Sequence, residues 1–187
     1  MRVRKFLIFA SVVLLVAYLA TKNPAWLPGW ARSAASAVAL PFRLAALSAK
    51  EADAELSVPV GGVRAAQVRD SWHAPRSNGR QHEGQDIFAP HGTPVYSATE
   101  GYVVKIGESE LGGSTVFVHG AGGRWYYYAH LDSYAPGLKV GDYVTPDTVL
   151  GRVGSTGNAA GTPPHLHFGV YTAAGAIDPL PLLVDRK

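Results

Sequence analysis

The sequence predicts a mainly β fold in which an antiparallel sheet forms the principal domain, over residues 58–187. Beyond residue 58 the apolar residues fall in short continuous or alternating runs, which are typical of strands. Turn signals rich in glycine and proline separate these runs at close spacing. No long helical pattern alternates with the runs, which argues against a parallel sheet with crossover helices. The expected strands are 94–95, 101–106, 114–119, 124–130, 149–153 and 165–171.

Three segments are expected along the chain. Its 187 residues, 47% of them hydrophobic, suffice for one packed domain, which is assigned to residues 58–187. Residues 1–22 are predicted to form an N-terminal membrane anchor or signal, and residues 23–57 a stalk. The stalk is alanine-rich, with apolar residues near helical spacing that Pro41 interrupts. Because alanine-rich segments propagate helix well but nucleate it poorly, a helical and a flexible stalk both remain open.

The N-terminal segment has the pattern of an export or anchoring signal, because an apolar run over residues 6–20 follows Arg2, Arg4 and Lys5. Fifteen helical residues extend ~22 Å, less than the ~30 Å hydrocarbon core, so length fits a signal peptide and a membrane helix equally. Cleavage after the run would place Tyr18 where a small residue is required, which favours an uncleaved anchor. The expected location is therefore the cell envelope. The chain is anchored in the inner membrane with its main domain outside the cytoplasm, or secreted if the segment is cleaved.

Charge and cysteine content narrow the choice of partners. Residues 1–57 hold seven Lys or Arg against three Asp or Glu, whereas residues 58–187 hold ten against eleven. The near-neutral domain lacks the basic face that binding to a phosphate backbone needs, which argues against nucleic acid as a partner. The sequence contains no cysteine, so any metal must be held by histidine and carboxylate.

One candidate metal-binding pair is His82 and Asp86, which lie four residues apart. On a straight strand this spacing would separate them by ~13 Å. Gly84 permits the chain to bend between them, and a bent loop brings both side chains within reach of a common ion. By itself, the pattern also fits an exposed polar loop.

A second candidate lies in the strand expected at residues 165–171. His165 and His167 share one face of this strand, while Leu166 and Phe168 occupy the opposite, apolar face. The two imidazoles are ~6–7 Å apart along the strand and can approach one site. The alternative is a polar surface face that carries two histidines by chance.

A third candidate is His130. Alternation along its strand places it on the same face as Tyr126 and Tyr128, opposite Tyr127 and Ala129. A histidine beside tyrosines suits a substrate groove. An aromatic strand that ends in a histidine without a chemical role is the alternative.

In combination, these motifs closely resemble those of the lysostaphin/LytM-type zinc peptidases of family M23. The order is His82-x-x-x-Asp86, then Tyr128-Ala129-His130-Leu131, then His165-Leu166-His167. The glycine-rich segments 89–95, 100–104, 139–144 and 150–157 are also similar to segments of that family. The resemblance covers residues 59–180 and implies the antiparallel β fold of this family, of the duplicated hybrid motif type.

The resemblance also implies a site and an activity. His82, Asp86 and His167 would bind Zn²⁺, while His130 and His165 would be the catalytic histidines that do not bind it. Three protein ligands leave a fourth position on zinc for a water of pKa about 7, which is a nucleophile at neutral pH. The implied function is an endopeptidase that hydrolyses peptide cross-links or stem peptides of bacterial peptidoglycan, at glycine bridges or at bonds to D-amino acids.

Two other classes of function fit part of this pattern. One is a non-catalytic module that binds peptidoglycan or activates a separate cell-wall hydrolase, which the intact ligand set argues against. The other is a non-haem iron centre, which also uses two histidines and one carboxylate but does not require the additional histidines. No role is assigned to His73, His91 or His119. The first two are expected in loops and the third at a strand end.

Overall fold

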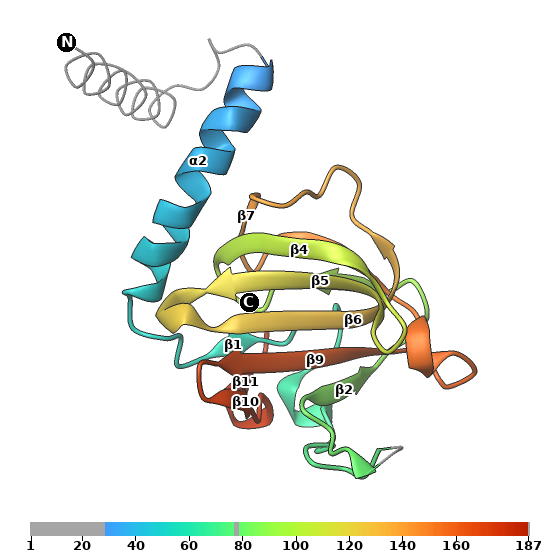
Figure 1. The fold of residues 1–187 in the computed structure, drawn as a ribbon. Coiled ribbons are helices and arrows are strands. Elements are labelled where there is room, and N and C mark those ends of the chain that lie inside the picture. The colour runs from blue at the N-terminus through green and yellow to red at the C-terminus, as the bar shows by residue number, and fades with distance from the viewer. Residues whose placement is uncertain (1–28, 77–78, 187) are drawn as a thin grey trace, which may run out of the picture. The chain divides into compact units, whose positions relative to one another are not determined.

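The computed structural model describes residues 29–76 and 79–186 (Figure 1). The chain forms two compact units, residues 1–45 and 46–187. The helix α2 (Gly29–Ser48) makes up the described part of the first unit and ends within the second. It continues through Pro41, at which the sequence predicted an interruption.

The predicted anchor, residues 1–22, lies outside the described residues. Within residues 29–76 and 79–186, no helix combines the length and the apolar character needed to cross a membrane.

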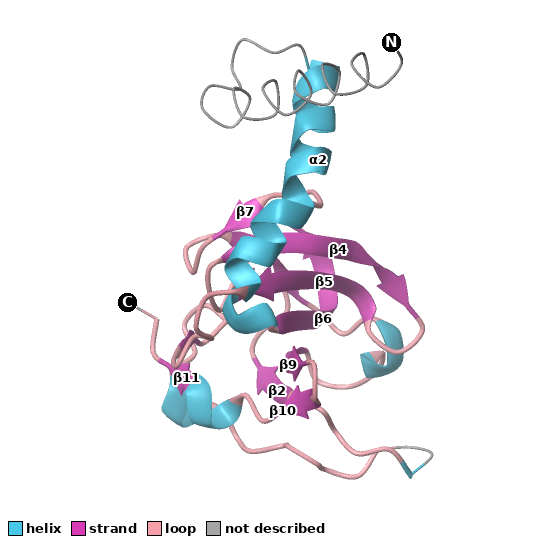
Figure 2. Cartoon of the chain, turned by 60° about the vertical axis from the view of Figure 1, so that its left-hand side comes forward, coloured by secondary structure: helices cyan, strands magenta, loops and turns pink. Residues whose placement is uncertain are grey.

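The second unit is built mainly of strands, as predicted (Figure 2). Its nine-stranded sheet has the order β10-β9-β6-β5-β4-β7, and every pair in it is antiparallel. In addition, β2 pairs with β9, and β8 pairs with β3 and β6. The strands are β2 (Gln85–Phe88), β3 (Pro94–Tyr96), β4 (Gly101–Ser109), β5 (Gly113–Gly120), β6 (Trp125–Tyr134), β7 (Tyr143–Val144), β8 (Val149–Val153), β9 (His165–Thr172) and β10 (Gly175–Ile177).

A second, two-stranded sheet departs from the predicted antiparallel pattern. It joins β1 (Leu56–Ser57) to β11 (Leu183–Val184) in parallel register. The pair brings the beginning and the end of the second unit together.

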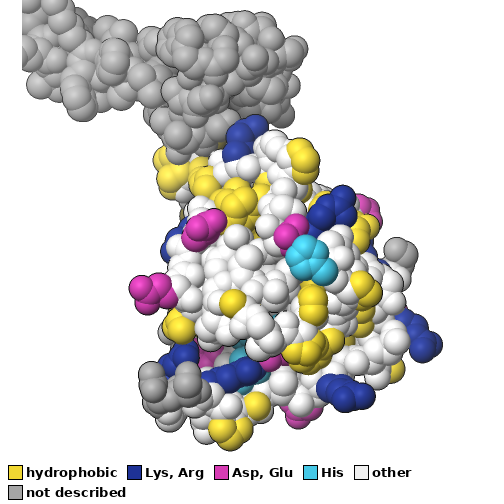
Figure 3. All heavy atoms as spheres, turned by 90° about the vertical axis from the view of Figure 1, so that its right-hand side faces the viewer, with side chains coloured by type: hydrophobic (Ala, Val, Ile, Leu, Met, Phe, Trp, Pro, Cys, Tyr) yellow, Lys and Arg dark blue, Asp and Glu magenta, His cyan; other side chains and the backbone are white. Residues whose placement is uncertain are grey.

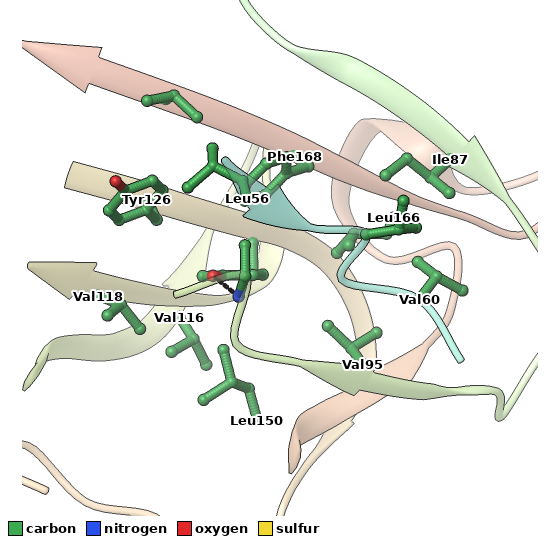
Figure 4. Close-up of a cluster of buried hydrophobic side chains, with 14 of the residues drawn as sticks. Leu56, Val60, Ile87, Val95, Val116, Val118, Tyr126, Leu150, Leu166 and Phe168 are labelled. Atoms are coloured by element: carbon green, nitrogen blue, oxygen red, sulfur yellow. Dashed lines mark hydrogen bonds between the residues drawn. The ribbon is translucent and has the colours of Figure 1, made fainter. Parts of the chain in front are cut away.

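The core lies on one face of the large sheet. Side chains that alternate along the central strands are fully buried there, including Val116 and Val118 of β5, Tyr126 and Tyr128 of β6, and Leu166, Phe168 and Val170 of β9. Leu56 and Val60, which precede the sheet in sequence, pack against them (Figure 4). The Tyr128 hydroxyl accepts a hydrogen bond from the Ala98 amide at 2.9 Å, so this buried polar group is satisfied.

All six predicted strands are present, and most extend beyond their predicted bounds. One strand of the site region was not predicted. Residues 85–88, expected within a bent loop, form β2 and pair with β9. This pairing positions the functional groups described next.

Candidate active site

Three possible metal ligands meet in the second unit. His82 Nε2 lies 3.0 Å from Asp86 Oδ1 and 2.8 Å from His167 Nδ1, and the last two atoms are 3.3 Å apart. Tetrahedral zinc with bonds of about 2.0–2.2 Å holds its ligand atoms about 3.3–3.6 Å apart. A small outward movement of the side chains would therefore accommodate the ion. In the described part of the chain, this is the one group of three or more such residues with this convergence.

Strand pairing explains how two of these residues meet. Asp86 of β2 lies directly opposite His167 of β9 in the antiparallel register. The Asp86 amide donates to Ser71 Oγ at 3.0 Å, and the Gln85 side-chain oxygen accepts from the Ser71 amide at 2.8 Å. These bonds fix β2 against the loop that precedes it.

The bend at Gly84 brings His82 to the place where Asp86 and His167 meet, as the sequence predicted. The bend does not need the left-handed conformation of glycine, because Gly84 is not among the residues with positive φ. The absence of a side chain matters for packing. A Cβ at this position would lie 2.8 Å from His167 Cε1 and 2.7 Å from the Phe168 carbonyl oxygen.

Neighbouring groups orient the ligands. His82 Nδ1 donates to the Ser71 carbonyl at 2.6 Å, which leaves the lone pair of Nε2 directed at the other two ligands. Arg76 pairs with Asp86 Oδ2, the oxygen that does not face His82. Burial raises the pKa of Asp86, but its interactions with His167, His82 and Arg76 outweigh this effect and hold the pKa well below its ordinary value. The carboxyl is therefore ionised, as a metal ligand must be.

Two further histidines flank the three ligands. The ring centroid of His130 lies 5.1 Å from that of His165 and 6.0 Å from that of His167. His130 Nδ1 donates to the Thr156 carbonyl at 2.9 Å, and His165 Nδ1 donates to the Pro163 carbonyl at 2.8 Å. Both bonds leave Nε2 as the available nitrogen.

The prediction for the orientation of His130 was wrong. Tyr126 and Tyr128 are buried in the core, whereas His130 lies in a cleft with Tyr127 and Ala129. His130 has a left-handed backbone, with φ of 62°, which breaks the alternation of the strand. Its amide donates to the Gly112 carbonyl at 2.8 Å, and the register of β6 against β5 shifts at the same place.

Two histidines of the cleft, His130 and His167, have pKa values below the usual range of histidine. Burial, together with the neighbouring His167 and His165, lowers the pKa of His130 to about 4. Burial also lowers the pKa of His167. Both imidazoles are therefore neutral at pH 7 and can accept protons or a metal.

All five predicted site residues line one cleft of about 450 Å³. Figure 3 shows the side of the molecule on which histidine, carboxylate and Lys or Arg side chains meet in a recess. The cleft is also lined by four residues that were not predicted to belong to the site: Arg76, Arg80, Tyr127 and Asn158. Arg80 lies two residues from His82 and Tyr127 three residues from His130, and this closeness in sequence was the available signal for these two.

The other three histidines lie outside this lining. His73 is exposed and stacks on Trp72 with ring centroids 4.5 Å apart, and the exposed His91 pairs with Asp132 at 3.1 Å. His119 is buried near the end of β5, where its Nε2 is 2.8 Å from Ser48 Oγ.

Comparison with known proteins agrees with the fold and the order of the motifs. The model of the family described as peptidase family M23 matches residues 80–179, and the chain belongs to this family. The L-Ala--D-Glu endopeptidase of Bacillus subtilis is 40% identical over 126 residues, which cover 62% of this chain and 39% of that protein. Lysostaphin of Staphylococcus simulans is 38% identical over 112 residues, which cover 57% of this chain and 22% of that protein. The chain thus matches less than half the length of both relatives.

Solved structures show the same likeness. The catalytic domain of lysostaphin from Staphylococcus simulans superposes with a TM-score of 0.54 and 34% identity, covering 63% of this chain and 92% of that domain. A zinc containing peptidase from Vibrio cholerae superposes with a TM-score of 0.57 and 26% identity, covering 68% of this chain and 39% of that one. These structures support the mainly antiparallel fold of the family.

Proposed function

We propose that the chain is a zinc-dependent endopeptidase that hydrolyses peptide cross-links or stem peptides of bacterial peptidoglycan. The observation that carries the proposal is the convergence of His82, Asp86 and His167 beside two further histidines in one cleft. Membership of peptidase family M23 supports it, as do relatives named for endopeptidase activity. The chain matches only part of those relatives, so the activity is proposed from its own site.

The three residues fit zinc in the chemistry of their atoms as well as in their spacing. They offer two imidazole nitrogens and one carboxylate oxygen, a set that leaves one position of a tetrahedral ion open. When bound, zinc would supply a water molecule of lowered pKa as the nucleophile. His82 and Asp86 are held for this role by Ser71 and Arg76.

His130 is the proposed general base. Its pKa of about 4 keeps it neutral at pH 7, and its bond to the Thr156 carbonyl leaves Nε2 free to take a proton. The same nitrogen, once protonated, can return a proton to the leaving amine. A base must lie within hydrogen-bond reach of its water, and the position of His130 beside His167 suits this.

His165 is the proposed partner of His130 in orienting the water and stabilising the tetrahedral intermediate. Its Nε2 lies 3.9 Å from Asp86 Oδ1 and so faces the three ligands. Its Nδ1, on the other side of the ring, bonds to the Pro163 carbonyl. In the protonated form, Nε2 can donate to the oxygen on which negative charge develops.

We also propose that residues 1–22 anchor the chain in the membrane or direct its export, so that residues 58–187 act in the cell envelope. The basic residues before the apolar run and the small number that follow it support this location.

The activity is tested by incubating the zinc-loaded chain with purified peptidoglycan, with and without chelator, and identifying the products by mass spectrometry. New amino termini that appear only without chelator are expected, and their masses identify the bond. A folded, zinc-loaded chain that releases no peptide would contradict the proposal and favour a binding role. His91→Ala, outside the cleft, is the matched control for His130→Ala.

A further inference from the structure

The cleft contains charged groups beyond the ligands and the two catalytic histidines. Arg76, Arg80, Glu83 and Asp86 line it, so the protein groups alone are balanced in charge. Asp86 contacts two kinds of group at once: one of its oxygens faces the histidines, and the other pairs with Arg76. A divalent ion at the three ligands would leave the lining net positive. Such a cleft favours an anionic ligand over a neutral one.

Backbone pairing of residues 74–76 with residues 80–82 places Arg80 at this lining. The His82 amide donates to the Ala74 carbonyl at 3.0 Å, and the Arg76 amide donates to the Arg80 carbonyl at 2.9 Å. Pro75 and Gln81 pair as an antiparallel bridge between them. The arm that leads into His82 is thus extended, and residues two apart on an extended arm share a face, ~6–7 Å apart. Arg80 and His82 are two residues apart on this arm, so they share a face.

The two arginines differ in their partners. Arg76 pairs with Asp86, so its charge is already compensated. Among the residues that the structure describes, the Arg80 guanidinium takes part in no ion pair, and its residue is exposed. A guanidinium binds a carboxylate through two parallel hydrogen bonds, a geometry that a neutral amide cannot match.

We propose that Arg80 binds a carboxylate of the peptide substrate. The inference rests on the proposed function and narrows it, because the substrate is then a stem peptide with a free carboxylate, and a neutral glycine bridge is excluded. A peptide residue spans at most ~3.3–3.6 Å. With Arg80 ~6–7 Å from His82 along the arm, the carboxylate lies within one or two residues of the bond that is cleaved.

The test compares two stem peptides that differ in one group, a glutamate with a free α-carboxylate and the same residue with a carboxamide. Binding is measured by titration calorimetry to the full, zinc-loaded chain carrying His130→Ala, which prevents turnover. The acid peptide is expected to bind about tenfold more tightly than the amide, the size expected for a charge-assisted hydrogen bond. In Arg80→Gln the two dissociation constants become equal, and in Arg80→Lys part of the preference returns.

Arg69→Gln is the matched control, because Arg69 is exposed and lies outside the lining of the cleft. It removes the same charge and is expected to keep the tenfold preference. Equal binding of the two peptides, no measurable binding of the acid peptide, or a preference that survives Arg80→Gln would overturn the inference. Failure of the proposed function would show separately, as an absence of peptidoglycan hydrolysis by the chain without these substitutions.

Discussion

His82 Nε2 and His167 Nδ1 lie 2.8 Å apart, although 85 residues separate the two histidines in the chain. The pairing of β2 with β9 creates this proximity, because it places Asp86 opposite His167 just after the bend that returns His82. Two neutral imidazoles at this distance share one proton, whereas a metal accepts a lone pair from each. The contact is therefore the geometric basis of the proposed zinc site.

Gly84→Ala is expected to weaken zinc binding at least tenfold, through the close approach of the backbone to His167. The new Cβ would lie 2.8 Å from His167 Cε1, and a displaced ligand or supporting group typically costs 10- to 100-fold in metal affinity. Competition with a chromogenic chelator measures the effect. Gly107→Ala is the control, because its Cβ meets no atom within 4 Å. Equal zinc affinities in the two variants would show that this packing does not matter.

Arg76→Gln is expected to lower zinc affinity about 10- to 100-fold, because Arg76 pairs with the Asp86 oxygen that does not face His82. Without the guanidinium, the pKa of Asp86 rises and protons compete better with the metal. The same competition assay applies, with Arg69→Gln as the charge-matched control. An affinity equal to that of the control would mean that Arg76 does not hold the ligand.

His130→Gly is expected to be more stable than His130→Ala by about 1 kcal/mol, since a left-handed backbone costs an alanine roughly that amount and a glycine nothing. Both variants lose the bond to the Thr156 carbonyl, so the difference reports the backbone alone. Urea unfolding measures it. Both should bind zinc and lack activity. An alanine variant as stable as the glycine variant would contradict the assigned conformation.

The pH dependence of stability is expected to reflect His130. Its pKa is about 4 in the folded chain and about 6.5 when unfolded, so the unfolded chain binds more protons between these values. The stability of the zinc-free chain should therefore fall as the pH drops from about 6.5 to about 4, and level off below. His130→Asn should remove this part of the loss. If the difference in stability between the unsubstituted chain and His130→Asn does not change with pH, the assigned burial of His130 is contradicted.

Local patterns predicted much of the fold and the site. The period-two alternation of His165, Leu166, His167 and Phe168 placed both histidines on one face, and the structure confirms the buried positions of Leu166 and Phe168. This succeeded because alternation in a regular strand depends on the strand alone.

Other features depend on single residues or on distant partners. One left-handed residue at His130 reversed the predicted face, and no pattern in the strand signals it. The strand β2 is only four residues long and carries Gln85 and Asp86 as buried polar residues, so its sequence resembles a loop. Its pairing with β9 and the contact between Arg76 and Asp86 arise from tertiary structure.

The most direct test of the zinc site is anomalous X-ray diffraction at the zinc edge from crystals grown with zinc. We expect one strong peak at about 2.0–2.2 Å from each of His82 Nε2, Asp86 Oδ1 and His167 Nδ1, and no peak there in crystals of His167→Ala. A zinc-saturated crystal with no peak at these three atoms, or with its peak elsewhere, would contradict the proposed zinc site.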